Sequence, residues 1–437
     1  MQSTPRTFRI KSFGCQMNVY DGERISELLT DTGLAAVADG EDADLVVLNT
    51  CHIREKAAEK AYSDVGRLKR EDGSRPMIAL AGCVAQAEGA EAKRRSPMID
   101  IVVGPQAYHR LPKMVAQATR GDRPVDTDMP AISKFDALPA RRRAAPSAFL
   151  TVQEGCDKFC TYCVVPYTRG AEISRPRADI VAEARALADA GAKEIVLLGQ
   201  NVNAWEYEGH DLADLIREIA RIDGLERIRY TTSHPADMSD PLIAAHGEVE
   251  KLMPYLHLTV QSGSNRILKA MNRSHTTETY LRTIEKMRAA RPDVAISGDF
   301  IVGFPGETEE DFEATLRIVD AVGYAAAYSF KYSARPGTPA AIMEDQVAPD
   351  IMDDRLQRLQ ARIARTQLAF NRSTAGRETQ VLIERRGRRP GQMIGRSPWL
   401  QSVHLQTGSE PGAMLDVTLT SAGPNSMTGA LRQKDAA

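Results

Sequence analysis

Short apolar segments alternate with helical patterns along most of the chain, and this alternation constrains the fold more than any other feature. In the first part the apolar segments lie at residues 7–14, 43–50, 77–82 and 99–104, and helical patterns follow at 19–32, 54–70, 86–95 and 108–119. Apolar strands separated by amphipathic helices are typical of a parallel sheet that is covered on both faces. We therefore predict an α/β protein that begins with an open parallel sheet domain at 6–120.

The same alternation resumes after a break. Residues 121–146 are rich in Pro, Asp, Ala and Arg without a sustained period, which favours a linker. Further apolar strands are expected at 149–152, 194–198, 228–232, 256–260, 295–302 and 326–332. Helical patterns at 180–190, 212–222, 277–290 and 309–322 separate most of them, and a long polar helix is expected at 350–371. Repeated β/α units of this length predict a partial (β/α)6 barrel over residues 147–372.

The last segment, residues 373–437, has a different pattern. Short strand candidates at 379–383, 393–394, 402–405 and 414–419 are separated by Gly and Pro, which predicts a small antiparallel β-barrel with Trp399 in its core. A basic loop lies between two of these strands. Arg pairs bidentately with phosphate, so the loop suits binding of an RNA backbone. The alternative is a charged hairpin that only contacts water, which is the more common role of a basic segment of this kind. The clustered arginines of the loop are Arg385, Arg386, Arg388 and Arg389.

The charge balance excludes a protein that binds polyanions through its bulk charge. The chain has 56 Lys and Arg against 58 Asp and Glu, a net charge of −2. No apolar run approaches the ~18 residues of a membrane span, and the start of the chain lacks the apolar core of a signal peptide. We therefore expect a cytoplasmic protein without a membrane partner, whose 6 Cys are ligands or catalysts rather than disulfides.

Three of the cysteines, Cys156, Cys160 and Cys163, form a C-x3-C-x2-C motif directly after the first barrel strand. A zinc site normally takes four ligands, and no histidine lies close to the motif in sequence. Three thiolates suit three corners of a [4Fe–4S] cluster and leave the fourth iron open to another ligand. The alternatives are three unrelated buried cysteines or a zinc site completed from far along the chain, and the spacing argues against both.

The other three cysteines, Cys15, Cys51 and Cys83, are far apart in sequence, yet each comes just after an apolar strand. The carboxyl ends of parallel strands meet at one edge of a sheet, where the ligand sites of open α/β sheets lie. Any one of these residues taken alone would be interpreted as a buried cysteine. Together they predict a second three-cysteine cluster, which assigns every cysteine of the chain to one of two sets.

The motif at 156–163 resembles that of the radical S-adenosylmethionine superfamily, which also places it after the first strand of a partial barrel. The resemblance implies that the open iron binds S-adenosyl-L-methionine (SAM) and that the reduced cluster cleaves it to a 5′-deoxyadenosyl radical. Phe159 and Tyr162 are expected to shield the cluster from water. Implied SAM contacts lie beside the motif and at the ends of the second and fifth strands. They are Tyr162, Gly199, Gln200, Asn201, Val302 and Gly303.

Over nearly the whole chain, the motifs are similar to those of the methylthiotransferase branch of this superfamily. They are SFGCQMN, NTCHIREKA, LAGCVAQ, GCDKFCTYCVVPYTRG, HLTVQSGS, GDFIVGFPGE and YSARPGTPAA. Members of the branch combine a three-cysteine N-terminal domain, the radical barrel and a small C-terminal β-barrel called TRAM. The resemblance therefore implies two [4Fe–4S] clusters, the second of which supplies or carries sulfur, and an RNA-binding TRAM domain at 373–437.

The residues after Cys51 resemble those of bacterial enzymes that methylthiolate C2 of N6-dimethylallyladenosine at position 37 of tRNA. This implies tRNA as the partner and SAM as both methyl donor and radical source. We also expect an external electron donor, such as flavodoxin or ferredoxin, and a monomer. Threonylcarbamoyladenosine in tRNA and an aspartate of a ribosomal protein are alternative substrates. An RNA-binding iron–sulfur sensor is the non-enzymatic alternative, and only an enzyme would cleave SAM.

Overall fold

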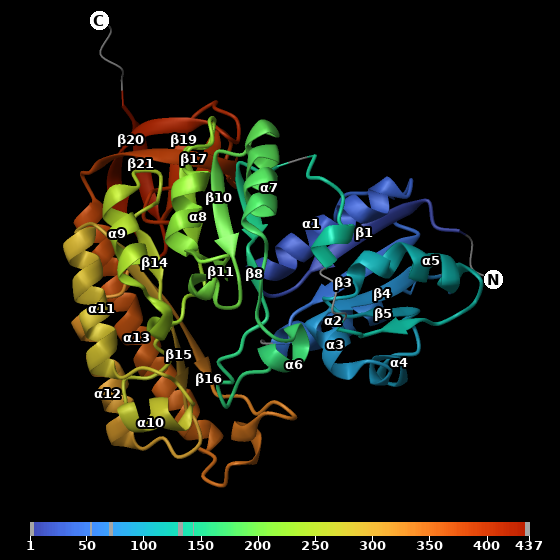
Figure 1. The fold of residues 1–437 in the computed structure, drawn as a ribbon, viewed down its shortest axis with the longest axis horizontal. Helices are drawn as coiled ribbons and strands as arrows, with labels where there is room; N and C mark the ends of the chain where they lie inside the picture. Colours follow the sequence, from blue (N-terminus) through green and yellow to red (C-terminus); the bar gives the residue numbers. More distant parts are fainter. Residues whose placement is uncertain (1–3, 53–54, 70–72, 130–133, 143, 433–437) are drawn as a thin grey trace, which may run out of the picture. The chain divides into compact units, whose positions relative to one another are not determined.

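The computed structural model describes residues 4–52, 55–69, 73–129, 134–142 and 144–432. The chain divides into two compact units (Figure 1). Unit 1 comprises Met1–Arg141, Glu154–Asp157 and Cys163–Ile173, and unit 2 comprises Arg142–Gln153, Lys158–Tyr162 and Ser174–Ala437. The segment from 154 to 173 therefore contributes residues to both units. No helix among the described residues has both the length and the apolar character needed to cross a membrane.

Unit 1 contains the predicted open parallel sheet. Its strand order is β2-β1-β3-β4-β5-β6, and every pair is parallel. The strands are β1 (Thr7–Ser12), β2 (Ala35–Ala36), β3 (Leu45–Thr50), β4 (Met77–Gly82), β5 (Ile101–Val103) and β6 (Val125–Asp126). The edge strands β2 and β6 are short and exposed or half-buried, so they lack the apolar run by which a strand is predicted.

The helices of unit 1 are α1 (Gln16–Asp31), α2 (Glu55–Arg67), α3 (Cys83–Glu88), α4 (Glu91–Arg95), α5 (Leu111–Thr119) and α6 (Val165–Arg169), with 3-10 turns η1 (Tyr108–Arg110) and η2 (Lys134–Ala137). The prediction of a single helix at 86–95 is wrong. The structure has two short helices there, α3 and α4, because Gly89 ends α3 with a φ of +51°. Arg54 and Arg70, the ends of another predicted helix, lie outside the described residues. So do residues 130–133, 143 and 433–437 of the predicted linker and last domain.

The two central strands of unit 1 are buried on both faces. Every residue of β3 and β4 is buried. Leu45 and Val47 pack into the apolar core on one face of the sheet, and Val46 and Leu48 pack into the core on the other. Because successive side chains of a strand point to opposite faces, such a continuous apolar run is typical of a covered parallel sheet.

Unit 2 contains the predicted partial barrel. Two parallel sheets, β7-β10-β13 and β14-β15-β16, are joined by parallel bridges between Ser233 and Leu258 and between Ile228 and Leu252. The strands are β7 (Ser147–Thr151), β10 (Glu194–Leu198), β13 (Arg227–Tyr230), β14 (Tyr255–His257), β15 (Ala295–Val302) and β16 (Ala326–Lys331). The predicted fold class is confirmed, and β10 and β15 have the predicted bounds.

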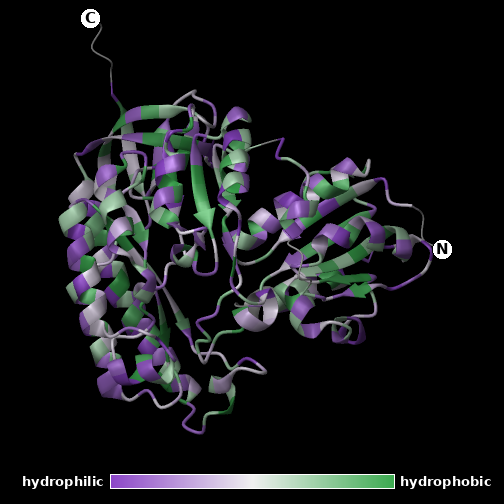
Figure 2. Cartoon of the chain, in the orientation of Figure 1, coloured by the Kyte–Doolittle hydropathy of each residue, from purple (hydrophilic) through white to green (hydrophobic). Residues whose placement is uncertain are grey.

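Most of the helices of unit 2 cover the outside of these strands. The helices are α7 (Arg177–Asp189), α8 (Leu212–Ile219), α9 (Asp240–Glu248), α10 (Asn265–Ala270), α11 (Thr277–Ala290), α12 (Glu309–Val322) and α13 (Pro349–Thr374). Of these, α10 packs in a separate apolar cluster with Phe304 and Tyr332. Shorter elements are β8 (Gln153–Glu154), β9 (Ile173–Ser174), β11 (Glu206–Tyr207), β12 (His210–Asp211), η3 (Val202–Ala204), η4 (Pro235–Asp237) and η5 (Pro339–Ile342). Figure 2 shows β10 as hydrophobic after its first residue, Glu194, whereas α7 carries both hydrophilic and hydrophobic residues, as expected of a helix with one buried face.

The end of the chain forms a closed five-stranded barrel in the order β17-β18-β19-β21-β20. The strands are β17 (Glu378–Arg386), β18 (Gln392–Arg396), β19 (Ser402–Gln406), β20 (Met414–Ala422) and β21 (Met427–Leu431). The prediction missed β21, a short strand whose residues are mostly exposed, and β19 pairs with β21 in parallel rather than antiparallel. Trp399 is 7% exposed and packs in the barrel core, so that prediction is confirmed.

Two buried arginines attach this closed barrel to the inner face of β13. Arg227 donates to the carbonyls of Gln380 and Arg396, at 2.7 and 2.8 Å, and Arg229 donates to those of Ser397 and Pro398, at 2.9 and 2.7 Å. Each guanidinium donates to backbone carbonyls of the small barrel from a side chain that is only 2% exposed. Unit 2 therefore includes both the partial barrel and the small C-terminal barrel, and the predicted limits at 372 and 373 stay a prediction.

Candidate active site

The cysteines of unit 1 lie at one edge of its sheet. Cys51 and Cys83 directly follow β3 and β4, and Cys15 follows β1 and precedes α1. Since β1, β3 and β4 are adjacent parallel strands, the three residues share the carboxyl edge of the sheet. Cys51 and Cys83 are 1% and 4% exposed, and Cys15 is half-buried. The sheet thus brings together three thiols that are 36 and 32 positions apart in the chain.

A glycine makes room for one of these thiols. Gly14 has a φ of +106°, and an added Cβ would lie 2.2 Å from the Cβ of Cys51 and 3.0 Å from its Sγ. Gly82, with a φ of +88°, is equally crowded by Thr50 O at 2.5 Å. Only glycine fits such a left-handed and crowded position without displacing its neighbours. The SFGC and LAGC motifs therefore place a glycine where the strand ends must approach closely.

The thiols of unit 1 interact with each other and with a buried cation. A hydrogen bond with Cys51, followed by burial, raises the pKa of Cys15 well above its usual value. Burial raises the pKa of Cys83, and Arg169 opposes this shift through its charge and a hydrogen bond. The Cys15 thiol also donates a hydrogen bond to Asn18 Oδ1, which lies outside the three-cysteine set, at 3.1 Å. Thiols with raised pKa values stay protonated until a metal displaces the proton.

Arg169 belongs to a charge-balanced cluster inside unit 1. Its guanidinium lies 2.7 Å from Asp21 Oδ2 and 3.0 Å from Glu154 Oε1, and Lys134 Nζ lies 2.7 Å from Glu154 Oε1 and 3.5 Å from Asp21 Oδ1. None of the four side chains is more than 3% exposed. Burial alone would lower the pKa of Arg169, but Asp21, Cys83 and Glu154 together raise it well above the usual value. The cation beside the thiols is therefore permanent.

The C-x3-C-x2-C loop is held by specific contacts on either side. Before it, Gly155 has a φ of +76°, and an added Cβ would lie 1.8 Å from Ala171 O, so only glycine fits. In unit 1, the Val165 N–H donates to Cys163 Sγ at 3.5 Å. In unit 2, Arg273 Nη1 donates to Cys160 Sγ at 3.6 Å. Donors directed at sulfur suit thiolate ligands.

The two aromatic residues of this loop differ in burial. Phe159 is 55% exposed and has a φ of +48°, whereas Tyr162 packs partly buried against Ile267 and Phe304. Asn272 donates to the carbonyl of Phe159 at 3.0 Å and thereby holds the strained residue. The exposed ring of Phe159 does not fit the predicted shielding role.

The predicted SAM contacts at the second strand lie on a polar network of unit 2. Gln153 Oε1 accepts from the backbone N–H groups of Gln200 and Asn201, at 2.9 and 3.1 Å. Asn201 Nδ2 donates to Asp237 Oδ2 at 2.7 Å, and Lys158 Nζ lies 2.7 Å from Asp237 Oδ1. Among the described residues, the buried Oδ1 of Asn201 accepts no hydrogen bond. A buried acceptor of this kind fits an amino group such as that of the SAM methionine.

Gly199 allows a close approach between the end of β10 and Gln153. An added Cβ would lie 2.6 Å from Gln153 Oε1 and 3.1 Å from Val202 Cα. The glycine therefore allows Gln153 to reach the amides that follow it. Gln153 was missed by sequence reasoning, because a polar residue after a strand gives no signal of its long-range partner.

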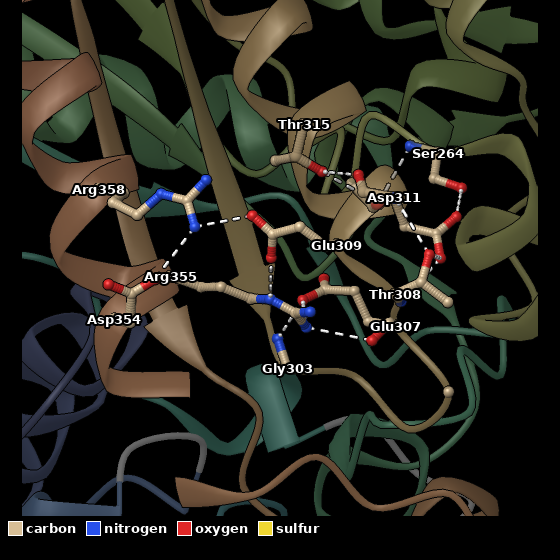
Figure 3. A network of polar contacts seen from close by, with 12 residues as sticks. Ser264, Gly303, Glu307, Thr308, Glu309, Asp311, Thr315, Asp354, Arg355 and Arg358 are labelled. Carbon is tan, nitrogen blue, oxygen red and sulfur yellow. Dashed lines mark hydrogen bonds and ion pairs between the residues drawn. The ribbon is translucent and has the colours of Figure 1, made fainter. Parts of the chain in front are cut away.

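The loop after β15 is held by a buried ion pair (Figure 3). Glu307 Oε1 accepts from the Gly303 N–H at 2.8 Å and pairs with Arg355 Nη1 of α13 at 2.8 Å. Burial raises the pKa of Glu307 to about 7, although the Gly303 N–H and Arg355 both oppose the shift. Gly303 has a φ of +72°, and an added Cβ would lie 2.2 Å from Met352 Cγ, also on α13.

These contacts limit how the loop can bind adenine. The Val302 carbonyl already accepts from the Tyr332 N–H at 2.8 Å, and the Gly303 N–H is taken by Glu307. The predicted adenine contact at Val302 and Gly303 therefore stays a prediction and would involve the remaining backbone groups. Glu307 and Arg355 act on the shape of the loop, and their separation of 48 positions hid the pair from sequence reasoning.

The arginines of the C-terminal loop are all exposed. Gln392 Oε1 accepts from the backbone N–H groups of Arg388 and Arg389, at 3.2 and 3.3 Å, and so shapes the turn between β17 and β18. Arg386 pairs with Glu410 at 3.1 Å, but both side chains are more than two-thirds exposed, so the pair is worth little. The side chains are thus accessible to a phosphate backbone.

Two family profiles match the chain. The profile described as "Radical SAM superfamily" matches residues 150–319, and that described as "Uncharacterized protein family UPF0004" matches residues 7–104. Among solved structures, the radical S-adenosylmethionine methyltransferase TsrM from Kitasatospora setae has a TM-score of 0.57 at 15% identity and covers 77% of both chains. The cobalamin-dependent SAM radical enzyme OxsB has a TM-score of 0.54 at 12% identity, covering 83% of this chain and 56% of that one. The fold and the match show a radical SAM domain within the chain.

Relatives that match nearly the whole chain define its family more closely than the domain profiles do. A tRNA-2-methylthio-N(6)-dimethylallyladenosine synthase from Sphingopyxis alaskensis is 68% identical over 431 residues, covering 97% of both chains. The synthase from Novosphingobium aromaticivorans is 66% identical and covers 98% of both chains, and one from Cereibacter sphaeroides is 59% identical and covers 98% and 99%. The chain therefore belongs to the family of tRNA-2-methylthio-N(6)-dimethylallyladenosine synthases.

Membership of this family implies SAM and [4Fe–4S] clusters as cofactors. In the described part of the chain, no group of three His, Cys, Asp or Glu side chains is arranged around one point as a single metal ion requires. A four-iron cluster instead gives each thiolate its own iron corner. The crowded glycines, the donors directed at sulfur and the cation beside Cys83 fit such clusters, as the buried acceptor of Asn201 fits SAM.

Proposed function

We propose that the chain transfers a methylthio group to C2 of N6-dimethylallyladenosine at position 37 of tRNA. The observation that carries the proposal is its identity of 59–68%, over nearly the full length, to synthases named for this product. The motif after Cys51 supports the same substrate. Nothing in these relatives favours threonylcarbamoyladenosine or a ribosomal protein as the substrate.

In this proposal the two cysteine sets have different roles. Cys156, Cys160 and Cys163 hold the cluster that binds SAM, and Cys15, Cys51 and Cys83 hold the cluster that carries sulfur. When bound, the clusters and SAM supply radical chemistry, which is needed because the C2–H bond of adenine is strong and its carbon resists polar attack at neutral pH.

The residues of the chain orient these groups. Asn201 Oδ1 accepts from the SAM amino group, and Glu307 with Arg355 fixes the loop that faces adenine. Tyr162, Gly199, Gln200, Val302 and Gly303 complete the proposed SAM contacts. Arg169 offsets the negative charge of the thiolates of the second set, since it is buried next to them. Such fixed charges act strongly because little water is present to screen them.

The proposed RNA contact is the loop of Arg385, Arg386, Arg388 and Arg389, whose exposed guanidinium groups suit phosphates. We also propose that an external donor such as flavodoxin or ferredoxin reduces the clusters and that the enzyme acts as a monomer. Because its substrate is tRNA, the proposed location is the cytoplasm.

The test of the function is nucleoside mass spectrometry of tRNA from a strain that lacks the gene. The 2-methylthio nucleoside should disappear, N6-dimethylallyladenosine should accumulate, and the wild-type gene should restore the product. In vitro, SAM with a deuterated methyl group should label the product. Unchanged tRNA in the deletion strain, or loss of the threonylcarbamoyl product instead, would contradict the proposal.

The RNA contact has its own test. Replacing all four loop arginines by Ala should flatten the dependence of tRNA affinity on salt by about one unit of slope for each lost phosphate contact. A matched control replaces four exposed arginines elsewhere in unit 2, which are Arg221, Arg282, Arg317 and Arg372. Equal slopes for the two variants would mean that the loop is only a solvated surface.

A further inference from the structure

The edge strand of the partial barrel carries two aromatic side chains that its packing leaves exposed. Tyr328 and Phe330 on β16 are 53% and 38% exposed. The parallel register pairs Asp299 with Tyr328 and Ile301 with Phe330, so these residues share one face of the sheet. Phe300, on the opposite face, is 0% exposed and packs in the main core beneath the helices. The exposed pair therefore lies on the inner face of the barrel, opposite the helices.

A histidine and a carboxylate lie beside this aromatic pair. The ring of His257, on β14, meets the ring of Tyr328 edge to face at 6.3 Å, and its Nε2 lies 3.4 Å from Asp299 Oδ1. The Thr232 N–H donates to Nδ1 at 3.3 Å, so the proton of the neutral ring is on Nε2. Within the described residues, this buried Nε2 makes no hydrogen bond. One donor and one acceptor thus face the same inner surface.

The backbone around this surface is strained. Thr232 and Gln261, which follow β13 and β14, have φ values of +69° and +74°. A left-handed conformation is uncommon for any residue other than glycine and is a genuine outlier for β-branched threonine. Strain of this kind costs about 1–3 kcal/mol per residue and is concentrated where it fixes a ligand-binding group. Here the Thr232 N–H fixes the orientation of His257.

A large ligand can reach the aromatic pair because β16 lies at the edge of its sheet. In the part of the chain that the structure describes, β16 pairs only with β15, so its other edge is open. A cavity of about 380 Å³ adjoins that edge and is lined by residues 327–330 of β16, by polar and apolar residues of α13, and by Pro424 and Asn425. The predicted SAM contacts lie instead beside the cysteine motif, at Tyr162, and at the carboxyl ends of β10 and β15.

We propose that Tyr328 and Phe330, with His257 and Asp299 beside them, bind the adenine base of the substrate RNA together with its N6-dimethylallyl group. This inference rests on the function proposed above. A purine stacks on aromatic faces, and a five-carbon alkenyl group gains from apolar contact. The Nε2–H of His257 and the carboxylate of Asp299 match the acceptors and donors on a purine edge. Phe330 and Tyr328 thereby distinguish the dimethylallyl nucleoside from adenosine.

The test compares two anticodon stem-loop RNAs, with and without the N6-dimethylallyl group, by fluorescence anisotropy on the anaerobically reconstituted enzyme. Wild-type enzyme should bind the modified RNA more tightly. Phe330→Ala and Tyr328→Ala should each weaken the binding of both RNAs, because the base stacks on these rings, and should in addition reduce the preference for the modified RNA about tenfold. Phe330→Leu should retain part of the preference, because it keeps apolar area but loses stacking. Leu431→Ala removes a similarly exposed apolar side chain of β21 and should change nothing.

Three results would overturn the inference. The first is an unchanged preference in both alanine variants, and the second is an equal loss of affinity for both RNAs. The third is a loss of affinity for S-adenosylhomocysteine with RNA binding intact, which would assign the surface to the cofactor adenine. Formation of the methylthio product by wild-type enzyme is measured in parallel. If wild type makes no product, the proposed function fails; if it makes product without preferring the modified RNA, only this inference fails.

Discussion

The two cysteine sets of this chain are assembled in opposite ways. Cys156, Cys160 and Cys163 lie in one short loop, so their spacing in the sequence defines the set. Cys15, Cys51 and Cys83 are brought to one sheet edge only because β1, β3 and β4 are neighbours. The first three cysteines, the loop set, depend on local backbone conformation. The second three, the sheet set, depend on the fold of a whole unit.

Their surroundings differ in the same way. The sheet set adjoins a buried, charge-balanced cluster of Asp21, Lys134, Glu154 and Arg169. The loop that carries the other set also contains Phe159, which is 55% exposed and is held in a strained conformation by Asn272. A site with an exposed, strained loop is typical of one that must admit a ligand.

The largest expected effect is on SAM cleavage and methylthiolation, which should depend on the two cysteine sets in different ways. Cys156→Ala should abolish SAM cleavage and methylthiolation, because the cluster that binds SAM cannot form. Cys51→Ala should abolish methylthiolation but retain formation of 5′-deoxyadenosine. Both products can be measured by liquid chromatography and mass spectrometry. If Cys51→Ala lost SAM cleavage as completely as Cys156→Ala, the two sets would not have separate roles.

A smaller effect concerns the buried cation of the sheet set. Arg169→Met should lower the free energy of unfolding by about 3–5 kcal/mol, because Asp21 and Glu154 lose a buried partner. It should also lower the reduction potential of the second cluster, because removing a positive charge disfavours the added electron. Denaturant titration and a redox titration followed by electron paramagnetic resonance measure the two quantities.

A matched control for this prediction is Arg229→Met. Arg229 is 2% exposed and pairs with Glu194 at 2.8 Å in unit 2, so its loss should destabilise the protein similarly. The potential of the second cluster should not change in this variant. Equal shifts of potential in both variants would show that Arg169 acts only through stability.

The smallest expected effect tests the crowded glycine. Gly14→Ala places a Cβ 2.2 Å from that of Cys51, and Gly40→Ala places one at a similar positive φ with nothing within 4 Å. Gly14→Ala should therefore cost about 1–3 kcal/mol more than Gly40→Ala in thermal or denaturant unfolding, because overpacking adds to the common backbone strain. Equal costs would mean that the sheet edge yields easily around Cys51.

The same contrast explains what could be predicted from sequence. The strands at 194–198 and 295–302 and the helices at 277–290 and 309–322 match the structure, because each has a strong apolar period. The loop set followed from spacing and the sheet set from the rule that parallel strands end at one edge. Pairs such as Glu307 with Arg355, and the burial of Lys134, could not be predicted, since each depends on a partner far away in the chain.

The most direct test of two separate cluster sites is the iron content of anaerobically reconstituted protein. Wild type should hold about eight irons per chain, since two four-iron clusters require this number. Replacing Cys15, Cys51 and Cys83 together by Ala should leave about four irons, and replacing Cys156, Cys160 and Cys163 together should also leave about four. Wild-type protein with only about four irons, or a triple variant of the sheet set that still holds about eight, would contradict the account.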